Sequence, residues 1–124
     1  MLHPLLVGIG GFLGSISRYL VSGLVQRLIP AASFPLGTLA VNVVGCLVIG
    51  LAAGAAEHRH SLDETTRALF FIGFLGGFTT FSTFGYETYA LARNSDMLGA
   101  AANITLHVVA GLGAVWLGFS LARP

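Results

Sequence analysis

Four long apolar stretches dominate this sequence, and each is long enough to cross a membrane as a helix. They run from about residue 5 to 28, 36 to 56, 66 to 92 and 97 to 121, with short polar connections between them. About 20 predominantly apolar residues span the hydrocarbon core of a bilayer as an α-helix. The sequence therefore predicts an all-α, multi-pass membrane protein, with four transmembrane helices in one membrane domain over residues 1–124.

The composition excludes several other classes of protein. Charged residues make up only 9% of the chain, against about a quarter of an average soluble domain. A formal net charge of +1 gives no basic patch for nucleic acid. The one cysteine, Cys46, forms neither an intrachain disulfide nor a zinc cluster. The first apolar stretch lacks the basic leader and the convincing cleavage site of a signal peptide, so we expect it to remain in the mature protein as a span.

The arginines are divided almost evenly between the two sides of the membrane. With four spans, both termini and the middle loop share one side, which carries Arg59, Arg67 and Arg123, whereas the other side carries Arg27 and Arg93. A protein of fixed orientation concentrates Lys and Arg on the cytoplasmic side. The near balance favours insertion in both orientations and pairing as an antiparallel homodimer. A single orientation that wins by a small margin is the alternative.

Small residues at a spacing of four predict close contacts between helices. Three such pairs are Gly10 with Gly14, Gly50 with Gly54, and Gly73 with Gly77. This spacing allows two helix backbones to approach closely in a membrane. The pattern does not identify the partner helix.

Residues 73–84, with the sequence GFLGGFTTFSTF, are the part of any span least suited to a helix. Adjacent glycines each cost about 1 kcal/mol relative to alanine in a helix, and threonine restricts χ1. We therefore expect a break around residues 76–80, near the middle of the bilayer. Irregular backbone at that depth is buried in protein or lines a cavity, where its carbonyls can bind a cation and its half-helix N-terminus favours an anion. A kink satisfied by Ser and Thr hydroxyls is the alternative.

Two aromatic residues follow the expected break. Phe81 and Phe84 lie three residues apart, on one helix face, with hydroxyl residues between and before them. The positive edges of two phenylalanine rings can stabilise a small dehydrated anion without a formal charge. The amide of Asn42 is a further hydrogen-bond donor, although such a residue also serves as a simple link between helices. Phe residues at this spacing are more often core or lipid-facing, so the neighbouring hydroxyls carry the hypothesis.

Other polar side chains lie inside the spans and are costly there unless they face protein or water. We expect Arg18 to be mainly structural, capping carbonyls, pairing with a carboxylate or lining a vestibule. Glu87 is expected near an aqueous mouth, protonated or paired. His107 is one turn after Asn103 in the fourth span, and a neutral, hydrogen-bonded histidine is expected there.

Four segments of the first three spans carry a specific resemblance. They are GFLGSISRY at residues 11–19, GTLAVN at 37–42, the glycine-bounded segment 45–50, and residues 73–84. Together they resemble the Fluc (CrcB) family of small bacterial fluoride channels. The fourth span is the weakest match, since Asn103, His107 and Gly111 stand where that family often has a tyrosine and serines.

The resemblance implies a non-enzymatic, fluoride-selective channel that exports fluoride passively across the bacterial cytoplasmic (inner) membrane and relieves fluoride toxicity. It implies an antiparallel, dual-topology homodimer with two pores. It also implies that Phe81, Phe84 and Asn42 line each pore, and that a sodium ion lies at the dimer centre. The remaining expected positions are the pathway residues Thr38, Ser82, Thr83, Asn103 and His107, the vestibule or structural residues Arg18 and Glu87, and the sodium-binding carbonyls of Gly76 and Thr79.

Two other functions remain open from the sequence. A four-span, proton-coupled exporter of small cations or drugs needs a membrane-embedded carboxylate, usually in its first span. The first span here carries Arg18 and no acidic residue, which counts against such an exporter. A membrane assembly subunit without transport would explain the glycines but not the clustering of break, hydroxyls and phenylalanines.

Overall fold

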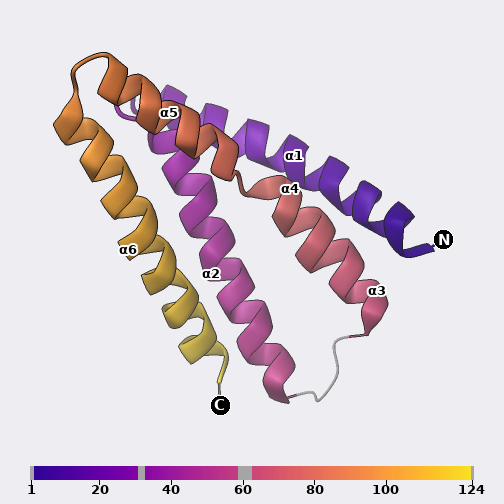
Figure 1. Cartoon of the computed structure of the whole chain (residues 1–124). Coiled ribbons are helices and arrows are strands. Elements are labelled where there is room, and N and C mark those ends of the chain that lie inside the picture. The colour runs from indigo at the N-terminus through magenta and orange to yellow at the C-terminus, as the bar shows by residue number, and fades with distance from the viewer. Residues whose placement is uncertain (1, 31–32, 59–62, 124) are drawn as a thin grey trace.

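The computed structural model describes residues 2–30, 33–58 and 63–123, which form helices joined by short connections (Figure 1). The described part contains four helical spans long and apolar enough to cross a membrane, so the all-α, four-span prediction is confirmed. Arg59, which entered the expected charge balance, lies outside the described residues. The elements are α1 (Leu2–Leu28), α2 (Leu36–His58), α3 (Glu64–Thr66), the π-helix η1 (Arg67–Leu75), α4 (Gly76–Phe78), α5 (Phe81–Arg93) and α6 (Met97–Ala122).

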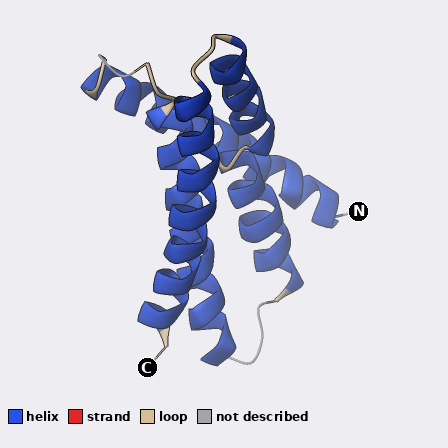
Figure 2. Ribbon diagram, turned by 60° about the vertical axis from the view of Figure 1, so that its left-hand side comes forward, coloured by secondary structure: helices blue, strands red, loops and turns tan. Residues whose placement is uncertain are grey.

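The third span changes neighbours halfway along its length. Its first half, η1 and α4, packs against α1, whereas its second half, α5, packs against α6 (Figures 1 and 2). Helices α2 and α6 lie side by side and form the most extensive contact between elements. The point where α4 ends and α5 begins therefore lies between the two pairs of helices.

The glycine pairs form contacts within one chain. A Cβ atom at Gly10 would collide with the carbonyl oxygen of Leu69, and one at Gly14 with that of Phe74, so α1 lies directly against η1 and α4. On the other side, α2 lies almost as close to α6 at Gly50 and Gly54, where a Cβ atom would meet the backbone of Val115 and Phe119. The small residues therefore explain the packing of the chain itself.

This packing predicts a large difference between two glycines of α1. Gly10→Ala places a methyl group against backbone, and we expect it to lower the free energy of unfolding by about 1–3 kcal/mol. The matched control is Gly8→Ala, because a Cβ there meets nothing within 4 Å. That control should be neutral or slightly stabilising, since alanine is the better helix former. Unfolding of both variants in detergent micelles measures the difference, and equal stabilities would contradict the packing.

The predicted position of the break was wrong at its N-terminal side. Gly76 and Gly77 are helical, and only Thr79 and Thr80 adopt extended conformations, with φ/ψ of −84°/159° and −149°/117°. The physical reason lies at Gly77, where a Cβ would meet the backbone of Gly11 in α1. The glycines of this segment thus permit helix contact, and the break depends on the residues after them. The π-helical conformation of η1 was not predicted, since nothing in the apolar pattern of this segment indicates it.

Candidate functional site

Asn42 of α2 holds the break in the third span. Its Nδ2 donates to the carbonyl oxygen of Thr80 at 3.0 Å, and its Oδ1 accepts from the Thr80 backbone N–H at 2.8 Å. Both backbone groups of a buried, non-helical residue are thus paired by one side chain. The amide acts as a bracket between α2 and the junction of α4 and α5.

This bracket redirects the helical hydrogen bonds around the break. In a continuous α-helix the N–H of residue 80 would donate to the carbonyl of Gly76, but here it donates to Asn42. Likewise the Thr83 N–H donates to Thr80 Oγ1 at 3.3 Å instead of to the carbonyl of Thr79. The Thr79 carbonyl accepts from Arg18 Nη1 at 3.2 Å. The two carbonyls expected to bind sodium, those of Gly76 and Thr79, are therefore among the carbonyls that lose their helical donors at the break.

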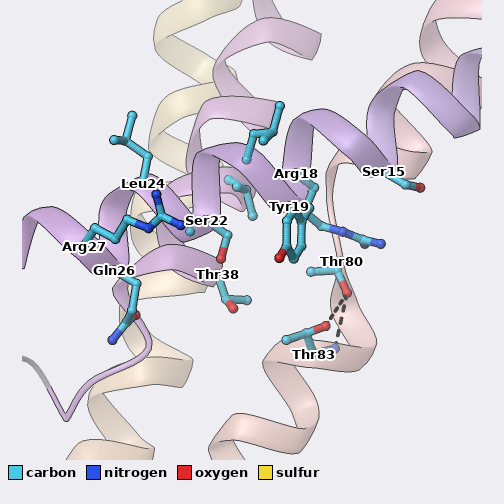
Figure 3. Close-up of a pocket in the computed structure, with 13 residues that line it drawn as sticks. Ser15, Arg18, Tyr19, Ser22, Leu24, Gln26, Arg27, Thr38, Thr80 and Thr83 are labelled. Carbon is cyan, nitrogen blue, oxygen red and sulfur yellow. Dashed lines mark hydrogen bonds between the residues drawn. The ribbon is translucent and has the colours of Figure 1, made fainter. Parts of the chain in front are cut away.

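Thr80 also starts helix α5 as its N-cap. Its side chain accepts from the Thr83 N–H and donates to Thr83 Oγ1 at 3.0 Å (Figure 3). Ser82 Oγ lies 3.4 Å from Thr80 Oγ1. An extended residue with a hydroxyl side chain is a preferred helix N-cap. Three hydroxyls therefore gather at the positive end of α5.

Two cavities lie on either side of this junction and share Thr80. The first has a volume of ≈ 880 Å³, and most of its lining residues carry polar side chains, with Arg18, Thr38 and Thr83 contributed by three different spans (Figure 3). The second, of ≈ 460 Å³, is lined by aromatic and small side chains together with Asn42 and His107. A polar and an aromatic cavity thus meet at the break.

The phenylalanine pair lines the second cavity. The ring centroids of Phe81 and Phe84 lie 5.4 Å apart, and their planes are tilted by 52°. Phe84 also contacts the ring of His107, with centroids 4.4 Å apart. Phe81 is 83% exposed in the single chain, so nothing within the described residues encloses its outer side.

The remaining expected residues lie farther along α5 and α6. Glu87 is paired, since its Oε1 accepts from the Thr38 hydroxyl at 2.7 Å, which is one of the alternatives expected for it. Asn103 is fully buried between α5 and α6 and donates to Thr88 Oγ1 at 2.9 Å, and it lines neither cavity. Arg18 caps a carbonyl and lines the polar cavity, two of the roles expected for it.

Two contributions were missed from the sequence. The amide of Asn42 was expected as a donor to an anion or a helix link, and its paired bonds to the Thr80 backbone were not foreseen. Thr80 was expected as one hydroxyl among several, whereas it is the N-cap of α5. A threonine before a new amphipathic segment is itself a helix-start signal, and it would have placed the break correctly.

Comparison with known proteins adds an independent finding. Residues 5–119 match the family described as "CrcB-like protein, Camphor Resistance (CrcB)". The chain is 46% identical over 123 residues to a "Fluoride-specific ion channel FluC" of Methylobacillus flagellatus, covering 99% of this chain and 96% of the relative. It is 45% identical over 118 residues to the protein of the same name from Nitratidesulfovibrio vulgaris, covering 95% and 94%. A relative from Methanosarcina acetivorans, "Fluoride-specific ion channel FluC 1", is 46% identical over 114 residues, covering 92% and 86%.

These matches extend over almost the whole chain and include all four spans. They confirm the resemblance seen in the first three spans and extend it to the fourth. With the break and the phenylalanine pair in place, sequence and fold point to one family. The chain belongs to the CrcB family of membrane proteins.

Proposed function

We propose that this protein is a fluoride-selective channel that lets fluoride leave the cell passively and so relieves fluoride toxicity. The observation that carries the proposal is the break at Thr79 and Thr80, bracketed by Asn42 and followed at once by Phe81 and Phe84. Neutral donors and ring edges thus gather at one place inside a membrane span. The relatives named fluoride-specific ion channels support the same function.

The family and the four spans make the chain a multi-pass protein of the bacterial inner membrane, as the sequence predicts. The relatives are named as ion channels, a class that is not enzymatic, and this agrees with the expectation of no enzymatic activity. A passive channel needs only a path of suitable width and a driving force. The membrane potential drives an anion outward, so no nucleotide is required.

Fluoride is small and strongly hydrated, so a selective path must replace its water shell at close range. In our proposal the hydroxyls of Thr38 and Thr83 take part in the polar cavity, where the guanidinium of Arg18 attracts anions. The second N–H of the Asn42 amide and the edges of the two phenylalanine rings then surround the ion in the aromatic cavity. The Asn42 amide and the two rings are neutral and add no charge that would hold the ion too tightly, which favours its release. Ser82 at the start of α5 and His107 in the aromatic cavity complete the proposed pathway, whereas Asn103, which lines neither cavity, links α6 to α5 through Thr88.

We propose that two copies pair in antiparallel orientation, with one pathway on each side. The exposed Phe81 and the hydroxyl residues after the break lie at mid-span, where lipid cannot satisfy irregular backbone or polar groups. A second copy covers them. In α1 and in α6, only 11% of the apolar 18-residue stretch that can span the membrane is buried within one chain, which leaves ample surface for a partner.

The same pairing would form a sodium site. Within the described residues, no group of three His, Cys, Asp or Glu side chains could hold a metal ion. Carbonyl oxygens suit a hard cation, and those of Gly76 and Thr79 are among the carbonyls at the break whose helical donors are redirected. Two such carbonyls from each copy would give four ligands around a two-fold axis. The ion would fix the two broken helices against each other.

Efflux from liposomes tests the proposed function. Purified protein in vesicles loaded with potassium fluoride should release fluoride, followed with a fluoride electrode once valinomycin removes the opposing potential. Vesicles loaded with chloride are the matched control and should release almost none. Dual topology has a separate test, in which a protease added on either side of the membrane should cut a cleavable C-terminal tag on part of the protein. This result supports dual topology only if it is obtained in native membranes as well as in these vesicles. Equal release of both anions, or none of fluoride, would refute the proposed channel.

A further inference from the structure

His107 has a defined hydrogen-bonding arrangement in α6. Its Nδ1 lies 2.9 Å from the carbonyl oxygen of Asn103, one turn earlier in the same helix. A carbonyl oxygen only accepts hydrogen bonds, so Nδ1 must carry the proton. In the neutral ring the other nitrogen, Nε2, is then an acceptor and not a donor.

Nothing in the described residues satisfies that second nitrogen. Nε2 is buried and has no hydrogen-bond partner. The ring stacks obliquely on Phe84 and lines the aromatic cavity together with Asn42. A lone pair on Nε2 repels an anion that approaches the ring, whereas a protonated Nε2 donates a hydrogen bond and adds positive charge.

We propose that His107 binds a proton at Nε2 together with fluoride, so that the imidazolium is a ligand of the ion in the aromatic cavity. This inference rests on the proposed function and adds a regulation to it. The proton comes from hydronium in the surrounding water, so one of its O–H bonds breaks as the Nε2–H bond forms, and a water molecule is left. Proton and fluoride then bind with positive coupling, each raising the affinity for the other.

The other charged and titratable groups near His107 belong to the two helices that pack against α6. Glu87 of α5 is close enough for its charge to interact with the imidazole, and its Oε2 is also buried without a partner. Cys46 of α2 lines the same cavity. Tyr86, Tyr89 and Arg93 of α5 are exposed, and Glu57 of α2 pairs with Arg123 at 3.2 Å. Glu87 is therefore the main rival source of pH dependence.

The test measures fluoride efflux at low internal fluoride from about pH 5 to 8, equal on both sides of the vesicle membrane. For the parent protein we expect the rate per channel to fall with rising pH, approaching about tenfold per unit at the alkaline end. His107→Gln should conduct at a rate independent of pH, because the glutamine amide donates at every pH. His3→Gln, at an exposed position near the N-terminus, should keep the parent profile. Glu87→Gln should keep the slope whatever its absolute rate.

A second measurement does not depend on flux. In the ¹⁵N spectrum of histidine-labelled protein, the signals absent from His107→Gln identify His107. Adding fluoride at constant pH should move them toward the protonated form, and chloride should not. A flat pH profile of the parent, or unchanged His107 signals with fluoride, overturns this inference while fluoride-selective flux leaves the channel intact. Absence of fluoride flux at every pH overturns the channel itself.

Discussion

Replacing Asn42 with alanine should abolish fluoride efflux and destabilise the protein more than any other single substitution near the break. The change removes the partners of both the N–H and the carbonyl of Thr80, a residue only 8% exposed. A buried backbone group left without a partner costs about 1–3 kcal/mol, so we expect a loss of about 2–6 kcal/mol in the free energy of unfolding. The same loss removes the contact that fixes the break, and the break shapes both cavities.

Val44→Ala is the matched control on the same helix, because Val44 is exposed and truncating it removes no hydrogen bond. It should retain stability and efflux close to those of the parent. Unfolding in mixed micelles gives the stability, and efflux from liposomes gives the rate. The bracket does not hold the break if Asn42→Ala keeps its efflux rate within about twofold of the parent and its free energy of unfolding within about 0.4 kcal/mol.

Much of the fold could be predicted because the bilayer imposes strong rules. Length and hydropathy alone give the four spans, since every backbone group in lipid must be paired within a helix. The spacing of Gly10 and Gly14 also predicted that another helix lies close to them, but it did not predict which helix that is. Which helix lies opposite depends on the whole arrangement in space, and four similar apolar stretches do not specify it.

The site was predictable as a set of residue types and less so as a set of contacts. The break, the phenylalanine pair and Asn42 all followed from local composition. Their connections did not, because the bonds from Asn42 to Thr80 and from Arg18 to Thr79 join segments far apart in the chain. The break was placed too early because glycine lowers helix propensity in general, whereas here Gly77 lies where only a helix without a side chain fits.

Replacing either phenylalanine with isoleucine should remove fluoride conduction and leave the protein folded. Isoleucine keeps an apolar side chain but has no ring, so it offers an anion no positive edge. Phe81 is 83% exposed in the single chain, and its loss creates no cavity there. We expect efflux from liposomes to fall at least about 100-fold for Phe81→Ile and for Phe84→Ile, which corresponds to about 2.7 kcal/mol on the barrier.

Assembly and flux must be measured together for this result to bear on the pore. Phe12→Ile is the control, since Phe12 is an exposed ring on α1 outside both cavities, and it should conduct like the parent. Size-exclusion chromatography and crosslinking report whether each variant still assembles. If Phe81→Ile and Phe84→Ile assemble and conduct like the parent, the ion does not pass between these rings. The aromatic cavity would then have a packing role, and the anion path would have to run along the hydroxyls alone.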